Sequence, residues 1–259
     1  MKKSFLICSL VGRMEDVLAL ISSLEKYHDW YLYLVLQKYP ADEIQIINMH
    51  CQKVFPARSH ILKTDMMTGP HLARCIALDL AKSDVWCILD DDMLAVDGFT
   101  NYDLMADIVF KNKHIGLLSS NWRKTQGMLN KVKLQDSLIK QPIVYTGGGM
   151  MLRQDVANII RNIPRTQYLF DNPLWSIYAY VNGFENYRWL GSAAIHRICA
   201  KGGRRKWIAE SDTSKKLPPK EWIRTRKGKS KQGFDEYLIC DSNDVTDEAK
   251  RLHEINKKV

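Results

Sequence analysis

The chain has 259 residues, 46% of them hydrophobic and 26% charged, and it carries a formal net charge of +9. This length is enough to bury a sizeable core in one large domain or two small ones, and the composition is ordinary for a soluble globular protein. No apolar run is long enough to span a bilayer, and charged residues interrupt the apolar start too early for a signal peptide. We therefore expect no transmembrane segment.

The six cysteines are scattered without any CxxC pairing, and several lie in apolar stretches such as "FLICSL" and "VWCIL". A reduced thiol in such surroundings behaves as a small hydrophobic side chain. We expect neither a zinc site nor a disulfide framework, and we predict a reducing compartment, the cytoplasm.

The first part of the chain alternates predicted strands and helices. Residues 4–11 form a short apolar run typical of a buried strand, residues 14–27 place apolar side chains at helical spacing, and residues 30–37 are rich in aromatic and branched side chains. A further helix–strand pair is predicted around residues 42–50. Residues 71–82 are predicted to be helical and lead directly into the apolar strand "VWCIL".

The pattern continues in the second part of the chain. Residues 114–122 and 142–152 are predicted strands. Residues 154–163 and 171–184 are predicted helices, the second opening with Asp-Asn and an early Pro. Strands that alternate with helices indicate an α/β domain with a mainly parallel sheet.

Three aspartates, Asp90, Asp91 and Asp92, directly follow the apolar strand in the stretch "DVWCILDDDM". In open α/β sheets, ligands bind outside the carboxyl ends of the strands. Asp90 and Asp92 are two positions apart, so an extended backbone would send both carboxylates to one side, where they suit a hard divalent cation. A solvated acidic turn explains the same three residues, and the residues alone leave both interpretations open.

Several motifs, in order, resemble the nucleotide-sugar core of GT-A-type glycosyltransferases. The helix with "HLARCIAL" precedes the "DDD" strand end, as an Ala-Arg-Asn-like segment precedes the family's DxD strand. "FLICSLVGR", "YTGGGMMLRQDV" and "FDNPLW…AAIHR" are similar to the family's first strand, its glycine-rich strand beside the donor sugar, and its acidic helix with a late histidine. The resemblance covers roughly residues 4–197. Cys75 replaces the usual Asn, and Asp171-Asn172 replaces an acidic pair.

The resemblance implies a Rossmann-related, GT-A-like fold and transfer of a sugar from a nucleoside diphosphate sugar, with a UDP-sugar favoured. It implies Mn²⁺ or Mg²⁺ to neutralise the leaving diphosphate. Asp92 and His196 are the implied metal ligands, although a structural role also explains the histidine. The implied donor-binding residues are Ser9, Arg13, Arg74, Asp90, Asp91, Gly147, Gly148 and Gly149.

An inverting transferase also needs a base for the acceptor hydroxyl. Asp171, at a predicted helix start, is the candidate, with Glu185 in reserve. A plain helix N-cap explains Asp171 equally well. The glycines of "TGGGMML" let the backbone approach a donor because they lack Cβ. The segment lacks the GxxxxGK and GxGxxG patterns, which argues against an NTPase and a dehydrogenase.

The net charge lies after the predicted core, because residues 197–235 hold thirteen Lys or Arg against four Asp or Glu. We expect a catalytic domain over residues 1–197 and a basic extension over residues 198–259, packed on it. Basic side chains among aromatic ones suit nucleic acid, but also an anionic membrane surface or a solvated tail. The candidate acceptor-binding residues are Arg204, Arg205, Lys206, Trp207, Trp222, Arg224, Arg226 and Lys227.

Charge and resemblance together favour DNA carrying a hydroxymethylpyrimidine as the acceptor, as in the family's bacteriophage branch, which would act in the host cytoplasm. The modified base would be flipped out of the stack to reach the donor. The alternatives are a glycosyltransferase for a membrane-associated lipid or polysaccharide, and a non-catalytic nucleic-acid-binding protein with a decorative acidic cluster.

Overall fold

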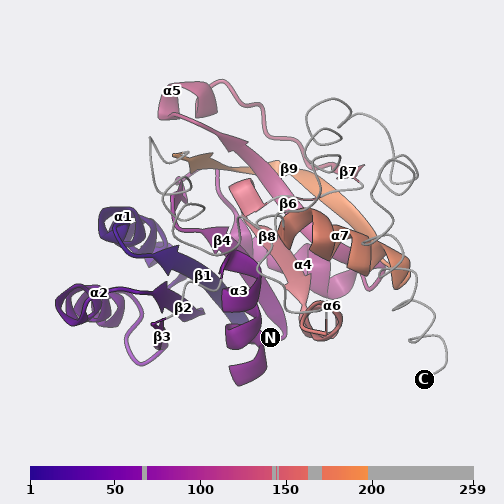
Figure 1. Ribbon diagram of the computed structural model, residues 1–259. Helices are drawn as coiled ribbons and strands as arrows, with labels where there is room; N and C mark the ends of the chain where they lie inside the picture. The colour runs from indigo at the N-terminus through magenta and orange to yellow at the C-terminus, as the bar shows by residue number, and fades with distance from the viewer. Residues whose placement is uncertain (66–68, 142–143, 145, 163–170, 198–259) are drawn as a thin grey trace, which may run out of the picture.

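The computed structural model describes residues 1–65, 69–141, 144, 146–162 and 171–197, which form one sheet with helices on both faces (Figure 1). The helices are α1 (Met14–Ser23), α2 (Ala41–Val54), α3 (Gly69–Leu80), α4 (Tyr102–Lys111), α5 (Gln126–Leu129), α6 (Gln154–Ile160) and α7 (Asp171–Val181), with 3-10 turns η1 (Glu25–Tyr27) and η2 (Thr146–Gly148). The strands are β1 (Lys3–Leu10), β2 (Tyr31–Gln37), β3 (Ser59–Thr64), β4 (Val85–Asp90), β5 (Met93–Leu94), β6 (Ile115–Arg123), β7 (Leu138–Lys140), β8 (Met150–Arg153) and β9 (Glu185–His196). None of the described helices is long and apolar enough to cross a membrane.

The sheet has the order β3-β2-β1-β4-β8-β6-β9-β5, with β7 added on β9. The long pairings, among β3, β2, β1 and β4 and between β6 and β9, are parallel, whereas β8 inserts antiparallel between β4 and β6. Since β9 runs in the same direction as β4, the carboxyl ends of β1, β2, β4, β6 and β9 all meet at one edge. The predicted α/β fold with a mostly parallel sheet is confirmed.

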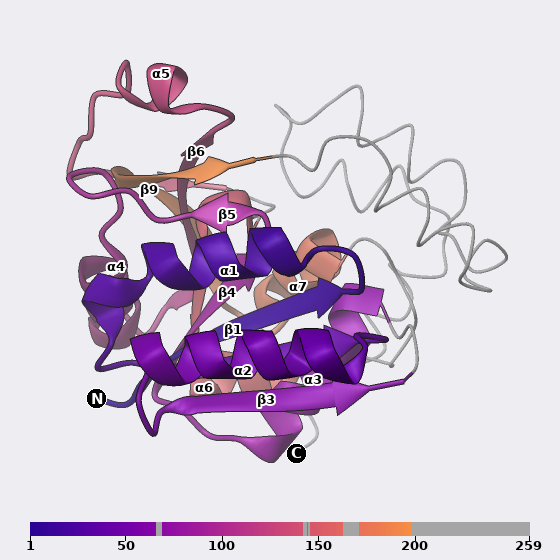
Figure 2. The ribbon, with the colours of Figure 1, turned by 90° about the vertical axis from the view of Figure 1, so that its left-hand side faces the viewer.

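Alternate strand residues enter two different cores, because successive side chains of a strand point to opposite faces of the sheet. Phe5 and Ile7 face the core under α1, α2 and α4, and Leu6 and Ile88 face the core under α3, α6 and α7. Figure 2 looks onto the face that α1 and α2 cover. Burial on both faces explains why β4 is apolar almost throughout and becomes polar only at its end.

The glycine segment corrects one prediction. A strand over residues 142–152 is wrong at its glycines: Thr146–Gly148 form the 3-10 turn η2, and β8 begins only at Met150. Gly149 has a φ of +90°, a left-handed conformation that extended pairing does not allow. The chain therefore turns toward the carboxyl edge before it enters the sheet.

Candidate metal and donor site

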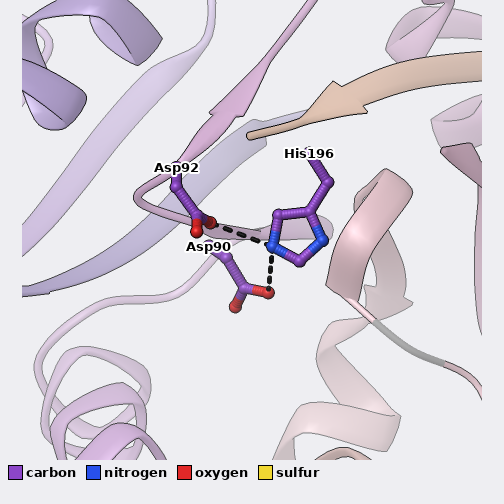
Figure 3. Close-up of side chains that lie close together, drawn as sticks. All are labelled: Asp90, Asp92 and His196. Atoms are coloured by element: carbon purple, nitrogen blue, oxygen red, sulfur yellow. Dashed lines mark ion pairs between the residues drawn. The ribbon is translucent and has the colours of Figure 1, made fainter. Parts of the chain in front are cut away.

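The aspartates at the end of β4 point in two directions. The strand ends at Asp90, and Asp91 and Asp92 form a turn, so it is not an extended backbone that brings the outer two together. Both converge on His196, the last residue of β9: its Nε2 lies 3.0 Å from Asp92 Oδ1 and 3.8 Å from Asp90 Oδ2 (Figure 3). Asp91 is buried and faces β1 instead.

Asp90, Asp92 and His196 together have the geometry of a cation site. Each offers one ligand atom, and these atoms all lie within 4.8 Å of one another. Carboxylate oxygens are the ligands that Mg²⁺ and Mn²⁺ prefer, and imidazole is a common ligand of divalent transition metals. The residues present therefore fit the divalent cation that the sequence predicted.

The surroundings of His196 make its ring responsive to a cation. Burial lowers the pKa of His196, but the hydrogen bond and charge of Asp92, with the charge of Asp90, outweigh burial, so the net pKa is raised. The other ring nitrogen, Nδ1, is buried and has no hydrogen-bond partner among the described residues. A cation at Nε2 would compete with a proton there, because metal ligands bind in their deprotonated form.

Asp90 is oriented by two hydrogen bonds. The Arg74 guanidinium, from α3, donates to Oδ1 at 2.7 Å, and the Thr146 hydroxyl, from η2, donates to Oδ2 at 2.7 Å. The side chain of Arg74 is 3% exposed and that of Asp90 is 30% exposed. Hydrogen bonds of this kind hold a ligating carboxylate in position, so Arg74 acts on Asp90 directly.

Asp91 ties the turn to β1. Ser9 Oγ donates to Asp91 Oδ2 at 2.6 Å, and Arg13 Nη2 lies 2.9 Å from Asp91 Oδ1 and 3.2 Å from Asp92 Oδ2. Ser9 also shares a 2.7 Å hydrogen bond with the Tyr39 hydroxyl. Burial raises the pKa of Asp91 to about 7, although Arg13 and Ser9 act to lower it. The predicted donor residues at the ends of β1 and β4 thus form one contiguous cluster.

The first two glycines of the triplet are crowded by protein atoms. A Cβ on Gly147 would lie 3.0 Å from His196 Nδ1 and 3.0 Å from the Trp122 ring. On Gly148 it would lie 2.5 Å from the Ser120 carbonyl oxygen. Packing against His196 and Trp122 therefore explains Gly147, and packing against β6 explains Gly148. Contact of their backbone with a donor stays a prediction.

Three further residues belong to this region and were not predicted from the sequence: Thr146, Tyr39 and Trp122. Trp122, from β6, packs edge-on against His196 with ring centroids 5.3 Å apart. A hydroxyl directly before three glycines is a signal that singles out Thr146. Tyr39 and Trp122 carry no local signal, because only the order of the strands brings the ends of β2 and β6 to this edge.

The two candidate bases lie in different places. Asp171 is the first residue of α7, and its side chain lies outside the described part of the structure. Trp175 anchors this helix, since its Nε1 donates to His71 Nδ1 of α3 at 2.8 Å. Glu185 begins β9, at the end of the strand opposite His196, and is engaged in an ion pair there. Glu185 is therefore remote from the cation cluster, and Asp171 stays the candidate.

The basic extension begins beside the cluster. The Arg197 amide donates to the Asp92 carbonyl at 2.8 Å, and its guanidinium lies 2.9 Å from Asp16 Oδ1. The candidate acceptor residues, from Arg204 to Lys227, lie outside the described residues. The described part of the chain thus ends next to the cation cluster.

No family model and no curated protein matches the sequence. Several solved structures share the fold. S. aureus TarS 1-349 in complex with UDP-GlcNAc has a TM-score of 0.55 and 16% identity, over 81% of this chain and 64% of its own. The mannosyltransferase PcManGT from Pyrobaculum calidifontis, with GDP-Man and Mn²⁺, has a TM-score of 0.60 and 14% identity, over 80% of this chain and 59% of its own. GalNAc-T7 with UDP, GalNAc and Mn²⁺ has a TM-score of 0.62 and 12% identity, over 89% of this chain and 51% of its own.

The chain has a GT-A-like fold. At these identities the likeness concerns the fold alone, and the chain spans between half and two thirds of the length of these three proteins. Within that fold, the described residues place an Asp-Asp-His cluster able to hold a metal ion at the carboxyl edge of the sheet.

Proposed function

We propose that the chain is a metal-dependent glycosyltransferase that uses a nucleoside diphosphate sugar, with a UDP-sugar favoured and Mn²⁺ or Mg²⁺ as the cofactor. The observation that carries this proposal is the convergence of Asp90, Asp92 and His196 at the edge where α/β sheets bind ligands. Structures that share the fold hold UDP-GlcNAc, GDP-Man or UDP, which supports the donor class.

Each residue of the cluster has a role in this proposal. A divalent cation, when bound, supplies charge stabilisation to the leaving diphosphate. Asp92 and His196 would hold the cation, and Asp90, which Arg74 orients through a hydrogen bond, would assist them. The neighbouring Ser9–Asp91–Arg13 contacts support the nucleoside side of the donor site, and Asp171 takes the proton of the acceptor hydroxyl.

Calorimetry tests the donor directly. We expect UDP to bind in the presence of Mn²⁺ and not after the metal is chelated, and Asp92→Ala to abolish that binding. Asp97→Ala is the matched control, because this side chain is 94% exposed and pairs only with Lys26 among the described residues. If neither UDP nor any other nucleoside diphosphate shows metal-dependent binding, the proposal is wrong.

For the acceptor we propose DNA that carries a hydroxymethylpyrimidine, ahead of a membrane-associated lipid or polysaccharide. The support is that the net charge of +9 lies in residues 197–235, which begin beside Asp92. The wild type would be offered a hydroxymethylated duplex, an unmodified duplex and anionic liposomes, with a labelled UDP-sugar. We expect transfer to the hydroxymethylated duplex alone.

Two other outcomes of this comparison favour the alternatives. Strong liposome binding without transfer to either duplex favours the membrane acceptor. DNA affinity that is unchanged in Asp92→Ala, with no UDP released from any donor, favours a non-catalytic nucleic-acid-binding protein.

A further inference from the structure

A cationic pocket lies beyond the cation cluster, at the carboxyl half of β6. It has a volume of about 450 Å³, and its wall includes Ser119, Asn121, Trp122, Arg123, Lys124 and Arg188. Pockets of this volume hold small molecules or chemical groups of similar size. None of the described residues that line it is acidic.

Within the described part of the chain, the three positive charges of the pocket have no counter-charge. Among the described residues, Arg123, Lys124 and Arg188 form no ion pair with a carboxylate. The only side-chain hydrogen bond of Arg123 among them is to the carbonyl of Trp122, at 2.7 Å. Arg188 is half-buried, and its Nε is shielded from water without a hydrogen-bond partner in the described residues. Burial and the like charge of Arg123 lower the pKa of Arg188. Such an arrangement is unfavourable until an anion offsets it.

The pocket and the cation cluster share a wall. Trp122 lines the pocket and packs edge-on against His196, and Gly147 fits closely against both rings. The Ser9–Asp91–Arg13 contacts lie at the end of β1, whereas the pocket lies on β6 and β9, on the other side of β4 and β8 in the sheet order. A group in the pocket would therefore approach the site from the side away from β1.

We propose that this pocket binds a phosphodiester of the acceptor strand and so holds the acceptor next to the transferred sugar. A guanidinium presents a planar fork of donors that matches two phosphate oxygens, and the two arginines with Lys124 supply the complementary charge. The hydroxyl of Ser119 and the amide of Asn121 add hydrogen-bond donors. This inference rests on the proposed transferase function for the identity of the acceptor, but the anion site itself can be tested without turnover.

The first experiment uses the whole 259-residue chain and a dinucleotide joined by one phosphodiester, with the uncharged methylphosphonate counterpart of that dinucleotide. We expect the phosphodiester alone to bind, and Arg188→Gln to weaken its binding about tenfold or more, because the variant loses a charge-assisted hydrogen bond to the phosphate. Lys53→Gln is the matched control: it removes one exposed positive charge on α2, at the other end of the sheet. UDP affinity with Mn²⁺ should be the same in all three proteins.

Three results would overturn the inference. One is equal dinucleotide affinity in the wild type and Arg188→Gln, and another is an equal loss in Lys53→Gln. The third is a fall in UDP affinity in Arg188→Gln, which would assign the pocket to the donor. If instead the wild type binds the dinucleotide as expected but no nucleoside diphosphate, the transferase proposal fails while the anion site is supported.

A second experiment uses only the wild-type protein, so its result does not depend on whether a variant folds. An arginine-directed reagent such as phenylglyoxal is applied to the wild type, and the modified residues are identified by mass spectrometry. We expect the dinucleotide to protect Arg123 and Arg188 at least several-fold, and the methylphosphonate to protect neither. Protection by phosphatidylglycerol vesicles but not by the dinucleotide would overturn the assignment to a nucleic-acid phosphate, and so would protection by neither.

Discussion

Asp92 and Asp171 have different proposed roles, so their substitutions should affect different steps. Asp171→Asn should leave Mn²⁺-dependent UDP binding within about twofold of the wild type and remove turnover, because a general base acts on the chemical step and not on donor affinity. Calorimetry and a single-turnover assay measure the two quantities. If Asp171→Asn loses donor binding as Asp92→Ala does, Asp171 is a ligand or a structural cap.

For Gly148, the structure predicts that substitution lowers the stability of the fold. A Cβ there would meet the Ser120 carbonyl oxygen and Oγ at 2.5 Å and the Asn121 carbonyl oxygen at 2.6 Å, and backbone atoms cannot move aside as a flexible side chain does. We expect Gly148→Ala to destabilise the fold by about 1–3 kcal/mol, the usual cost of overpacking. Gly127→Ala, with nothing within 4 Å of the added atom, should be near neutral. Urea unfolding of both variants measures their stability, and equal unfolding midpoints would refute the expected difference.

At the scale of elements, the contact between α3 and α7 should matter for turnover. Trp175→Phe removes the hydrogen bond to the buried His71 and leaves its Nδ1 without that donor. The expected loss of stability is about 1–3 kcal/mol. Since α7 begins at Asp171, the turnover number should also fall, by about tenfold, because small displacements of a catalytic group are costly.

Trp86→Phe is the control for this effect. Trp86 is equally buried and its Nε1 donates to Gln154 of α6 at 3.0 Å, so its loss should destabilise the fold comparably without loosening α7. If both variants lose turnover to the same extent, the effect reflects general destabilisation and not the position of α7.

Elements with a strong local pattern were predictable, and those defined by pairing were not. Apolar runs in the sequence mark four strands whose two faces are both buried, namely β1, β2, β4 and β6. α4 was missed although Asn101 caps it by accepting from the Leu104 amide at 3.1 Å, a local signal that the sequence does carry. β9 mixes half-buried and buried residues without a regular alternation and has register shifts against β6, so its length follows from its neighbours and not from its own periodicity.

At the scale of the whole molecule, the sequence located the acidic half of the site but not its assembly. Asp90 to Asp92 end a recognisable strand, whereas His196 lies more than a hundred positions away and was placed only by resemblance. What joins them is the antiparallel pairing of β5 with β9, which places Met93, the residue after Asp92, opposite His196. Arg188 and Trp122 had no local signal for the same reason: their neighbourhood is set by pairings that no short stretch of sequence encodes.

The charge distribution of the whole chain leads to the last prediction. Changing Arg204, Arg205 and Lys206 to Glu should weaken binding to a hydroxymethylated duplex and reduce turnover, while UDP affinity stays nearly unchanged. Binding of the wild type should fall steeply between 50 and 200 mM salt, by a slope of roughly 0.9 per phosphate contact, and the triple variant should have a shallower slope because fewer counterions are released. A control that changes Lys53, Lys111 and Lys113 to Glu alters the net charge equally on exposed parts of α2 and the end of α4. The acceptor role of the extension is refuted if both triple variants lose DNA affinity to the same extent, because the effect then follows from net charge and not from the place where the charge lies.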